Sequence, residues 1–213
     1  MSRIRPGKQQ QSRKGQSRSA DGGKRSGRHP LSRTKLRRRI NLAAGLVVAL
    51  GIVSTPWWVP GLKRQGFQAL ADEGRTEMRS RVVTENSEGR GHDHSHVTYG
   101  SFPTSGAHSP TWVDPGVYTS HQSKARLVHA LEHGNIVIYY DDPPDEVLDR
   151  LRKWTSTYDN QWSGIVVTPS PGLGESIILT AWTHKLRMNT FQPAVAAAFI
   201  DTYRGRGPEN PVR

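Results

Sequence analysis

The sequence predicts a small α/β domain, a sandwich built on a mixed β-sheet, that follows one N-terminal transmembrane helix. Helix and strand signals alternate between residues 123 and 203, in the order helix, strand, helix, strand, strand, helix. A strand–helix–strand unit favours two parallel strands with the helix packed across them. An α+β arrangement is the alternative. A long uncharged apolar run before this region indicates the transmembrane helix.

The first predicted elements lie between residues 123 and 158. Residues 123–133 are predicted to be helical and to stop at Gly134, because glycine commonly ends helices. The apolar side chains on one face of this helix are Leu127, Val128 and Leu131. Residues 136–140 form a continuous apolar run of strand length. Residues 143–158 show a second helical pattern, with acidic residues in its first turn.

The remaining predicted elements are two strands and a helix. The strands cover residues 165–167 and 177–182, and the loop between them is rich in proline and glycine. We expect these two strands to form a hairpin. Residues 192–203 are predicted to form the last helix, which stops at Gly205.

The excess of positive charge is confined to the first fifth of the chain. The formal net charge is +12, of which residues 1–39 contribute +13 and the remaining residues −1. This basic segment has too few apolar residues to form a core, so we expect a disordered tail. Such a tail could bind nucleic acid or anionic lipid. Next to a transmembrane segment, however, its charge is better explained as the signal that keeps the N-terminus in the cytoplasm. Nucleic acid is therefore not the expected partner.

The apolar run spans residues 40–62, which carry no charge. About 20 apolar residues suffice for a helix to cross the hydrocarbon core of a bilayer, so we predict a transmembrane helix at residues 40–60. Basic residues are denser before the run than after it, which places the N-terminus in the cytoplasm. A cleaved signal peptide would need a small-residue site near the run, and the nearest one, at residues 69–71, lies too far away. We predict an uncleaved signal anchor in a bacterial cytoplasmic membrane.

Two segments are expected beyond the anchor. Residues 61–91 are polar and interrupted by glycines, which favours a stalk or linker. Residues 92–208 are then expected to form the extracytoplasmic domain. The chain has no cysteine, which excludes disulfides, thiol catalysis and cysteine-based metal sites.

Histidines are the main candidates for chemistry. Eight of the nine histidines lie between residues 92 and 184. His129 and His133 lie four residues apart on one predicted helix face, where two imidazoles could hold Zn²⁺ or Cu²⁺. His108 is the expected third ligand, and the alternating histidines of a nearby run are accessory candidates: His92, His94 and His96. Alternatively, His129 and His133 only offset the helix dipole, and the alternating run is a polar linker.

Residues 129–133 also match the H-x-x-E-H pattern of some zinc peptidases. In that interpretation His129 and His133 hold zinc and Glu132 acts as the general base. Such an enzyme needs a further carboxylate ligand, for which the next predicted helix offers no distinctive spacing. An enzymatic role is therefore the less favoured hypothesis.

Several short motifs resemble a bacterial family of domains of unknown function, family 3105. They lie in order at residues 102–108, 112, 116–118, 127–134, 136–140, 181–182 and 203–209. The resemblance covers residues 89–209 and implies a basic N-terminus and a single membrane anchor. It implies no activity.

The sequence thus predicts a single-pass envelope protein whose outer domain binds a divalent transition metal. The alternatives are a metal-free accessory or interaction subunit of an envelope complex and a zinc-dependent hydrolase. The expected partners are the membrane, an envelope protein and anionic lipid at the tail.

Overall fold

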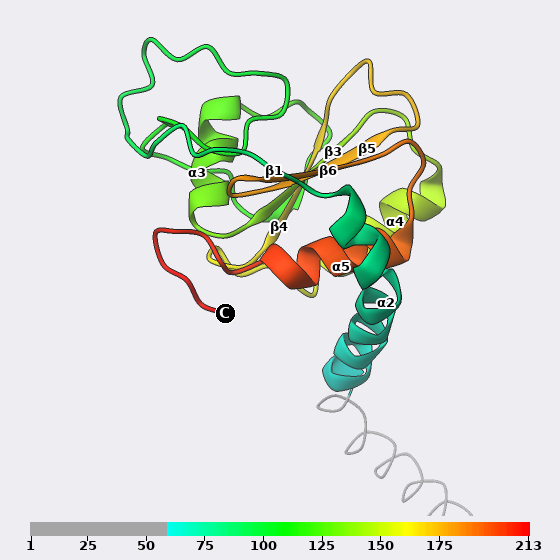
Figure 1. The fold of residues 1–213 in the computed structure, drawn as a ribbon. Helices are drawn as coiled ribbons and strands as arrows, with labels where there is room; N and C mark the ends of the chain where they lie inside the picture. The colour runs from blue at the N-terminus through cyan, green and yellow to red at the C-terminus, as the bar shows by residue number, and fades with distance from the viewer. Residues whose placement is uncertain (1–58) are drawn as a thin grey trace, which may run out of the picture. The chain divides into compact units, whose positions relative to one another are not determined.

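The computed structural model describes residues 59–213 (Figure 1). The predicted tail at residues 1–39 lies outside this range. So does the predicted transmembrane helix at residues 40–60, except for its last two residues. None of the helices within the described range has the length and hydrophobicity needed to cross a membrane.

The described part of the chain has four α-helices and a mixed six-stranded sheet, which confirms the predicted fold class. In chain order the elements are α2 (Val59–Arg81), β1 (Val83–Thr84), β2 (Gly116–Val117), α3 (Lys124–Glu132), β3 (Ile136–Tyr140), α4 (Asp145–Thr155), β4 (Ile165–Pro169), β5 (Ile177–Ala181), β6 (His184–Met188) and α5 (Pro193–Tyr203).

Strand β3 lies near the centre of the sheet, whose order is β1-β6-β5-β3-β4-β2. It pairs parallel with β4 and antiparallel with β5. Helix α4 connects the parallel pair, as the strand–helix–strand pattern predicts. All five residues of β3 are buried, because helices cover both faces of the sheet.

The two faces of the sheet carry separate cores. Ile136 and Ile138 of β3 pack into the larger core with residues of α2, α4 and α5, whereas Val137 and Tyr139 face α3. This alternation is the two-residue period of a strand, and Figure 1 shows α3 apart from the other three helices. Among the described helices, α3 is thus the one that packs on this face of the sheet, and it carries the candidate ligands.

Helix α2 corrects the expectation of a stalk at residues 61–91. It is continuous through Gly66 and Gly74, and it packs along α5 with Phe67, Ala71 and Met78 buried in the larger core. Gly74 is there for close packing, because a Cβ atom at this position would lie 2.1 Å from the backbone of Ala194. The folded domain therefore begins before residue 92.

The expected hairpin between residues 165–167 and 177–182 is also wrong. Strand β3 lies between β4 and β5, and β5 instead forms a hairpin with β6, which was not predicted. Strand β6 has the alternating pattern of a half-covered strand, with Leu186 and Met188 buried and Arg187 exposed.

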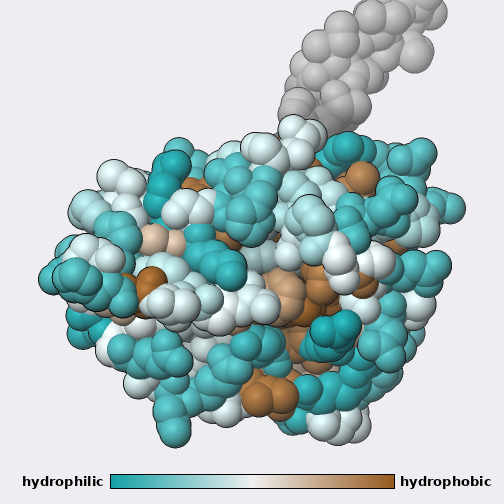
Figure 2. Space-filling model, turned by 90° about the horizontal axis from the view of Figure 1, so that it is seen from above, coloured by the Kyte–Doolittle hydropathy of each residue, from teal (hydrophilic) through white to brown (hydrophobic). Residues whose placement is uncertain are grey.

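The surface of the described domain is mainly hydrophilic on the face shown in Figure 2. Among residues 64–213, the exposed large hydrophobic side chains are Val83 and Val212. Most other large hydrophobic side chains of this part of the chain are buried in the two cores or partly buried against them.

Candidate metal site

Helix α3 places three ionisable side chains on one face. His129, Glu132 and His133 stand at positions i, i+3 and i+4, which share a face of an α-helix. The opposite face packs on the sheet through apolar residues that include Leu127, Ala130 and Leu131. The three ionisable groups are nevertheless buried, so other segments of the chain must cover them.

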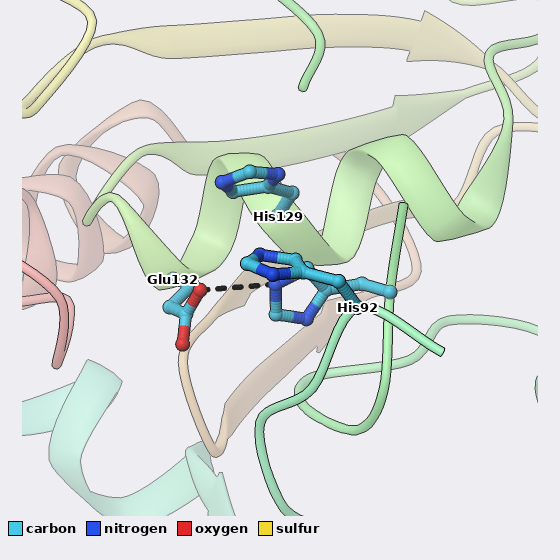
Figure 3. A group of neighbouring side chains, drawn as sticks. His92, His129 and Glu132 are labelled. Carbon is cyan, nitrogen blue, oxygen red and sulfur yellow. Dashed lines mark ion pairs between the residues drawn. The ribbon is translucent and has the colours of Figure 1, made fainter. Parts of the chain in front are cut away.

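One cover is the loop region before α3. The Gly106 N–H donates to the Gly89 carbonyl at 3.1 Å, and the His108 N–H donates to the Gly91 carbonyl at 2.6 Å. These bonds tie the start of the loop region to its middle and bring His92 and His108 together over α3. Figure 3 shows His92 beside His129 and Glu132.

His92, His108, His129 and Glu132 form the first candidate ligand set, which we call the three-histidine group. Their ligand atoms all lie within 4.8 Å of one another. The ring centroid of His108 is 4.8 Å from that of His129 and 5.1 Å from that of His92. Glu132 Oε2 lies 2.9 Å from His108 Nε2. Three imidazoles and a carboxylate therefore converge on one point.

Backbone carbonyls fix the tautomers of two of these histidines. Nδ1 of His108 lies 2.8 Å from the Gly106 carbonyl oxygen, and Nδ1 of His129 lies 2.8 Å from that of Ser109. A carbonyl oxygen can only accept, so in the neutral rings each Nδ1 carries the proton and each Nε2 keeps its lone pair. Metal-binding histidines are typically held in this way.

The Nε2 atom of His108 is buried and has no hydrogen bond of acceptable geometry. Glu132 Oε2 is close enough, at 2.9 Å, but it is not placed for a hydrogen bond. A buried polar atom without a partner is costly. A metal ion between His108 and Glu132 would satisfy both groups, which fits the chemistry of this donor set.

A second candidate set, the C-terminal group, consists of His129, His133 and Glu209. Glu209 Oε2 lies 3.1 Å from His133 Nε2 and 3.7 Å from His129 Nε2. The last segment of the chain reaches the end of α3 because the Gly205 N–H donates to the Gly134 carbonyl at 2.8 Å. The Glu209 N–H also lies within hydrogen-bond distance of the Glu132 carbonyl, at 3.3 Å.

This approach depends on two glycines. Gly134 ends α3 with a φ of +98°, a conformation that other residues rarely adopt. A Cβ atom on Gly207 would lie 2.1 Å from the Glu132 carbonyl oxygen. Larger residues at either position would push the C-terminal segment, and with it Glu209, away from α3.

Two tryptophans and an arginine border the cluster. The ring of His133 lies close to the rings of Trp112 and Trp162, with centroid distances of 4.6 and 4.1 Å. Arg90 Nη1 donates to the Pro208 carbonyl at 3.1 Å, and Arg90 Nε lies 3.7 Å from Glu132 Oε1. Arg90 thereby links the loop, the helix and the C-terminal segment around the cluster.

The structure brings together most of the predicted site residues, in a different grouping from the predicted one. His108 and His129 are neighbours, and His92 joins them, whereas His133 belongs to the set with Glu209. Neither described group includes His94 or His96. The sequence suggested Glu132 as a general base, whereas the structure places its carboxylate within 4.8 Å of the ligand atoms of three histidines.

Glu209 and Trp162 were missed by sequence reasoning. Glu209 falls within the last motif of the family resemblance, but nothing in its spacing connects it to a helix far earlier in the chain. Trp162 lies in a turn between α4 and β4, and its contact with His133 is a product of tertiary folding.

Burial lowers the pKa of two histidines at the site. Loss of solvation is the main cause for His129, partly opposed by the hydrogen bond to the Ser109 carbonyl. Loss of solvation also dominates for His133, where the negative charge of Glu209 opposes it. Both pKa values fall below the ordinary value of 6.5, so both rings favour the neutral, metal-binding form near neutral pH.

The metal-free protein should therefore lose stability as the pH falls below about 6.5. In that range the unfolded chain binds protons at these histidines that the folded chain does not, and the loss should level off once the folded pKa values are passed. We expect the double variant His129→Gln/His133→Gln to lose less stability than the wild type between pH 7.5 and 5.5. Urea unfolding in the presence of a chelator measures this difference. Parallel pH profiles would contradict the assignment.

The fold and site define a small α/β domain with a buried histidine–carboxylate cluster between a helix and two chain segments. A family model described as "Protein of unknown function (DUF3105)" matches residues 92–213, more than half of the chain. The chain belongs to this family, as the sequence motifs indicate. No curated protein and no solved structure shows a significant match to the chain. Helix α2 and strand β1 precede the matched region.

Proposed function

We propose that this domain binds one divalent transition-metal ion, Zn²⁺ or Cu²⁺, through the three-histidine group. The observation that carries the proposal is the convergence of three imidazoles and a carboxylate within 4.8 Å. The carbonyl contacts of His108 and His129 support it, because they direct two Nε2 lone pairs away from the backbone acceptors.

The donor set favours these two metals on chemical grounds. Imidazole suits ions of borderline softness, and one carboxylate adds a negative charge without the oxygen-rich shell that Ca²⁺ or Mg²⁺ requires. The chain has no cysteine and only three methionines, so a thiolate or thioether site for Cu(I) is not supported.

The full-length protein, loaded with Zn²⁺ or Cu²⁺ and desalted, should retain one ion per chain by elemental analysis. Glu132→Gln should weaken binding, because an amide replaces the carboxylate at ligand distance. The matched control His94→Ala/His96→Ala should keep the full metal content, because these histidines lie outside both groups. A wild-type protein without stoichiometric metal would contradict the proposal and favour a metal-free interaction subunit.

A second candidate function, zinc-dependent hydrolysis, is favoured by Glu209. Together with His129 and His133 it supplies the further carboxylate that the H-x-x-E-H pattern requires. In that case Glu132→Gln would retain zinc and abolish zinc-dependent hydrolysis, for example of p-nitrophenyl acetate. Loss of zinc from the same variant supports the binding function instead.

We further propose that the chain is a single-pass protein of a bacterial cytoplasmic membrane with this domain outside. The proposal is supported by the apolar run at residues 40–62 and by the basic residues before it. Protease added to intact spheroplasts should then digest the C-terminal domain and spare an N-terminal tag. Protection of the domain would contradict this topology.

A further inference from the structure

We infer that His129 is shared by two alternative positions of a single ion, so that the ion can pass between the three-histidine group and the C-terminal group. This inference rests on the proposed metal-binding function. It assigns the site a role in transferring the ion, in addition to holding it.

His129 is the one residue of the described chain that belongs to both candidate ligand groups. Its ring centroid lies 4.8 Å from that of His108, in one group, and 4.7 Å from that of His133, in the other. An ion could therefore exchange its other ligands one at a time while it stays bound to His129.

The two positions cannot both be complete at once. Nδ1 of His129 is held by the Ser109 carbonyl at 2.8 Å, which leaves Nε2 as the free ligand atom. Bridging two ions would require His129 to give up both the Nδ1 proton and this hydrogen bond. The structure therefore predicts one ion per chain, although the two groups together contain six ligand residues.

The two positions offer different coordination. The three-histidine group supplies four protein ligands, which can close a tetrahedral site. The C-terminal group supplies three, which leaves a coordination position open to water or to an incoming ligand. An ion in the C-terminal group is thus the one that can be handed to an acceptor.

Each position also reaches the surface at its own residue. His92 is the exposed member of the three-histidine group. Glu209 is the exposed member of the C-terminal group, with 42% of its side chain exposed. The buried His129 belongs to both groups and therefore connects the two positions. An ion can therefore enter beside one exposed residue and leave beside the other.

A double-mutant cycle tests this inference in the full-length protein, with Zn²⁺ affinity measured by competition with a chromophoric chelator. Glu209→Gln alone should weaken binding by less than about 3-fold, because the three-histidine group remains complete. His108→Ala should weaken binding by about 10-fold or more and leave one ion on the C-terminal group. In the His108→Ala background, Glu209→Gln should then cost a further 10-fold or so.

The outcomes separate this inference from the proposed function. Two ions bound at once, or the same small effect of Glu209→Gln in both backgrounds, would overturn the shared position while metal binding stands. Loss of all binding in Glu209→Gln alone would place the ion permanently in the C-terminal group, which also overturns it. No binding by the wild type would overturn the proposed function itself. If His108→Ala does not fold, the exposed His92→Ala serves in the same cycle.

Discussion

Replacing His129 by alanine should weaken Zn²⁺ binding by about 100-fold or more, the largest effect expected of any single substitution at the site. His129 is a member of both candidate ligand groups, so its loss leaves neither group complete. His133→Ala removes a ligand from the C-terminal group alone and should cost much less. Isothermal titration of the full-length protein with Zn²⁺ measures both effects.

His121→Ala is the matched control for this comparison. His121 is exposed, lies outside both groups, and its Nδ1 is 3.1 Å from the Pro169 carbonyl oxygen. Its removal should leave the affinity unchanged, and circular dichroism should show that all variants remain folded. Equal losses for His129→Ala and His121→Ala would show that binding does not depend on the cluster.

Gly74→Ala should destabilise the domain by about 1–3 kcal/mol, although alanine favours helices over glycine. The added Cβ atom would lie 2.1 Å from the backbone of Ala194, so α2 and α5 would have to separate. These helices form much of the larger core, and their separation would expose side chains such as Phe67 and Phe199. Urea unfolding followed by tryptophan fluorescence gives the change in the free energy of unfolding.

Gly66→Ala provides the control within the same helix. Apart from the adjacent residues and the backbone of its own helix, a Cβ atom at this position meets no atom within 4 Å, so the substitution should stabilise the protein by about 0.5–1 kcal/mol. The two substitutions therefore have opposite expected signs. Equal stabilisation by both would mean that α2 does not pack against α5.

The parts of the fold that sequence reasoning predicts well are those with strong local signals. Strand β3 is an uninterrupted apolar run, and α3 ends where Gly134 takes a positive φ. Helix α2 was misjudged because its glycines were taken as interruptions. Its buried residues do follow a helical period, at positions 67, 71, 74 and 78, but only the contact with α5 shows that Gly74 serves packing.

Sheet order depends on contacts that local sequence does not encode. The insertion of β3 between β4 and β5 was not predictable from the loop that joins β4 to β5. Strand β6 has one buried face and therefore lacks the continuous apolar run of its neighbours. Its alternation of polar and apolar residues is a weaker signal over five residues.

The candidate site likewise has one part that local sequence predicts and one part that depends on tertiary contacts. The pairing of His129 with Glu132 and His133 follows from helical spacing, and His108 was a reasonable third member. The assignment of His133 to a set with Glu209 depends on how the C-terminal segment docks at Gly134. That contact joins residues that lie 71 to 77 positions apart in the chain, and no spacing rule could have supplied it.

The proposed ion lies at a defined place in the protein, and anomalous X-ray scattering tests this position most directly. Crystals of the protein grown with Zn²⁺ should show their main anomalous peak at the zinc edge about 2.0–2.1 Å from Nε2 of both His108 and His129. A peak of partial occupancy between His129 and Glu209 would agree with the shared position. No peak at the cluster, or peaks only at surface histidines such as His96 and His121, would contradict the account.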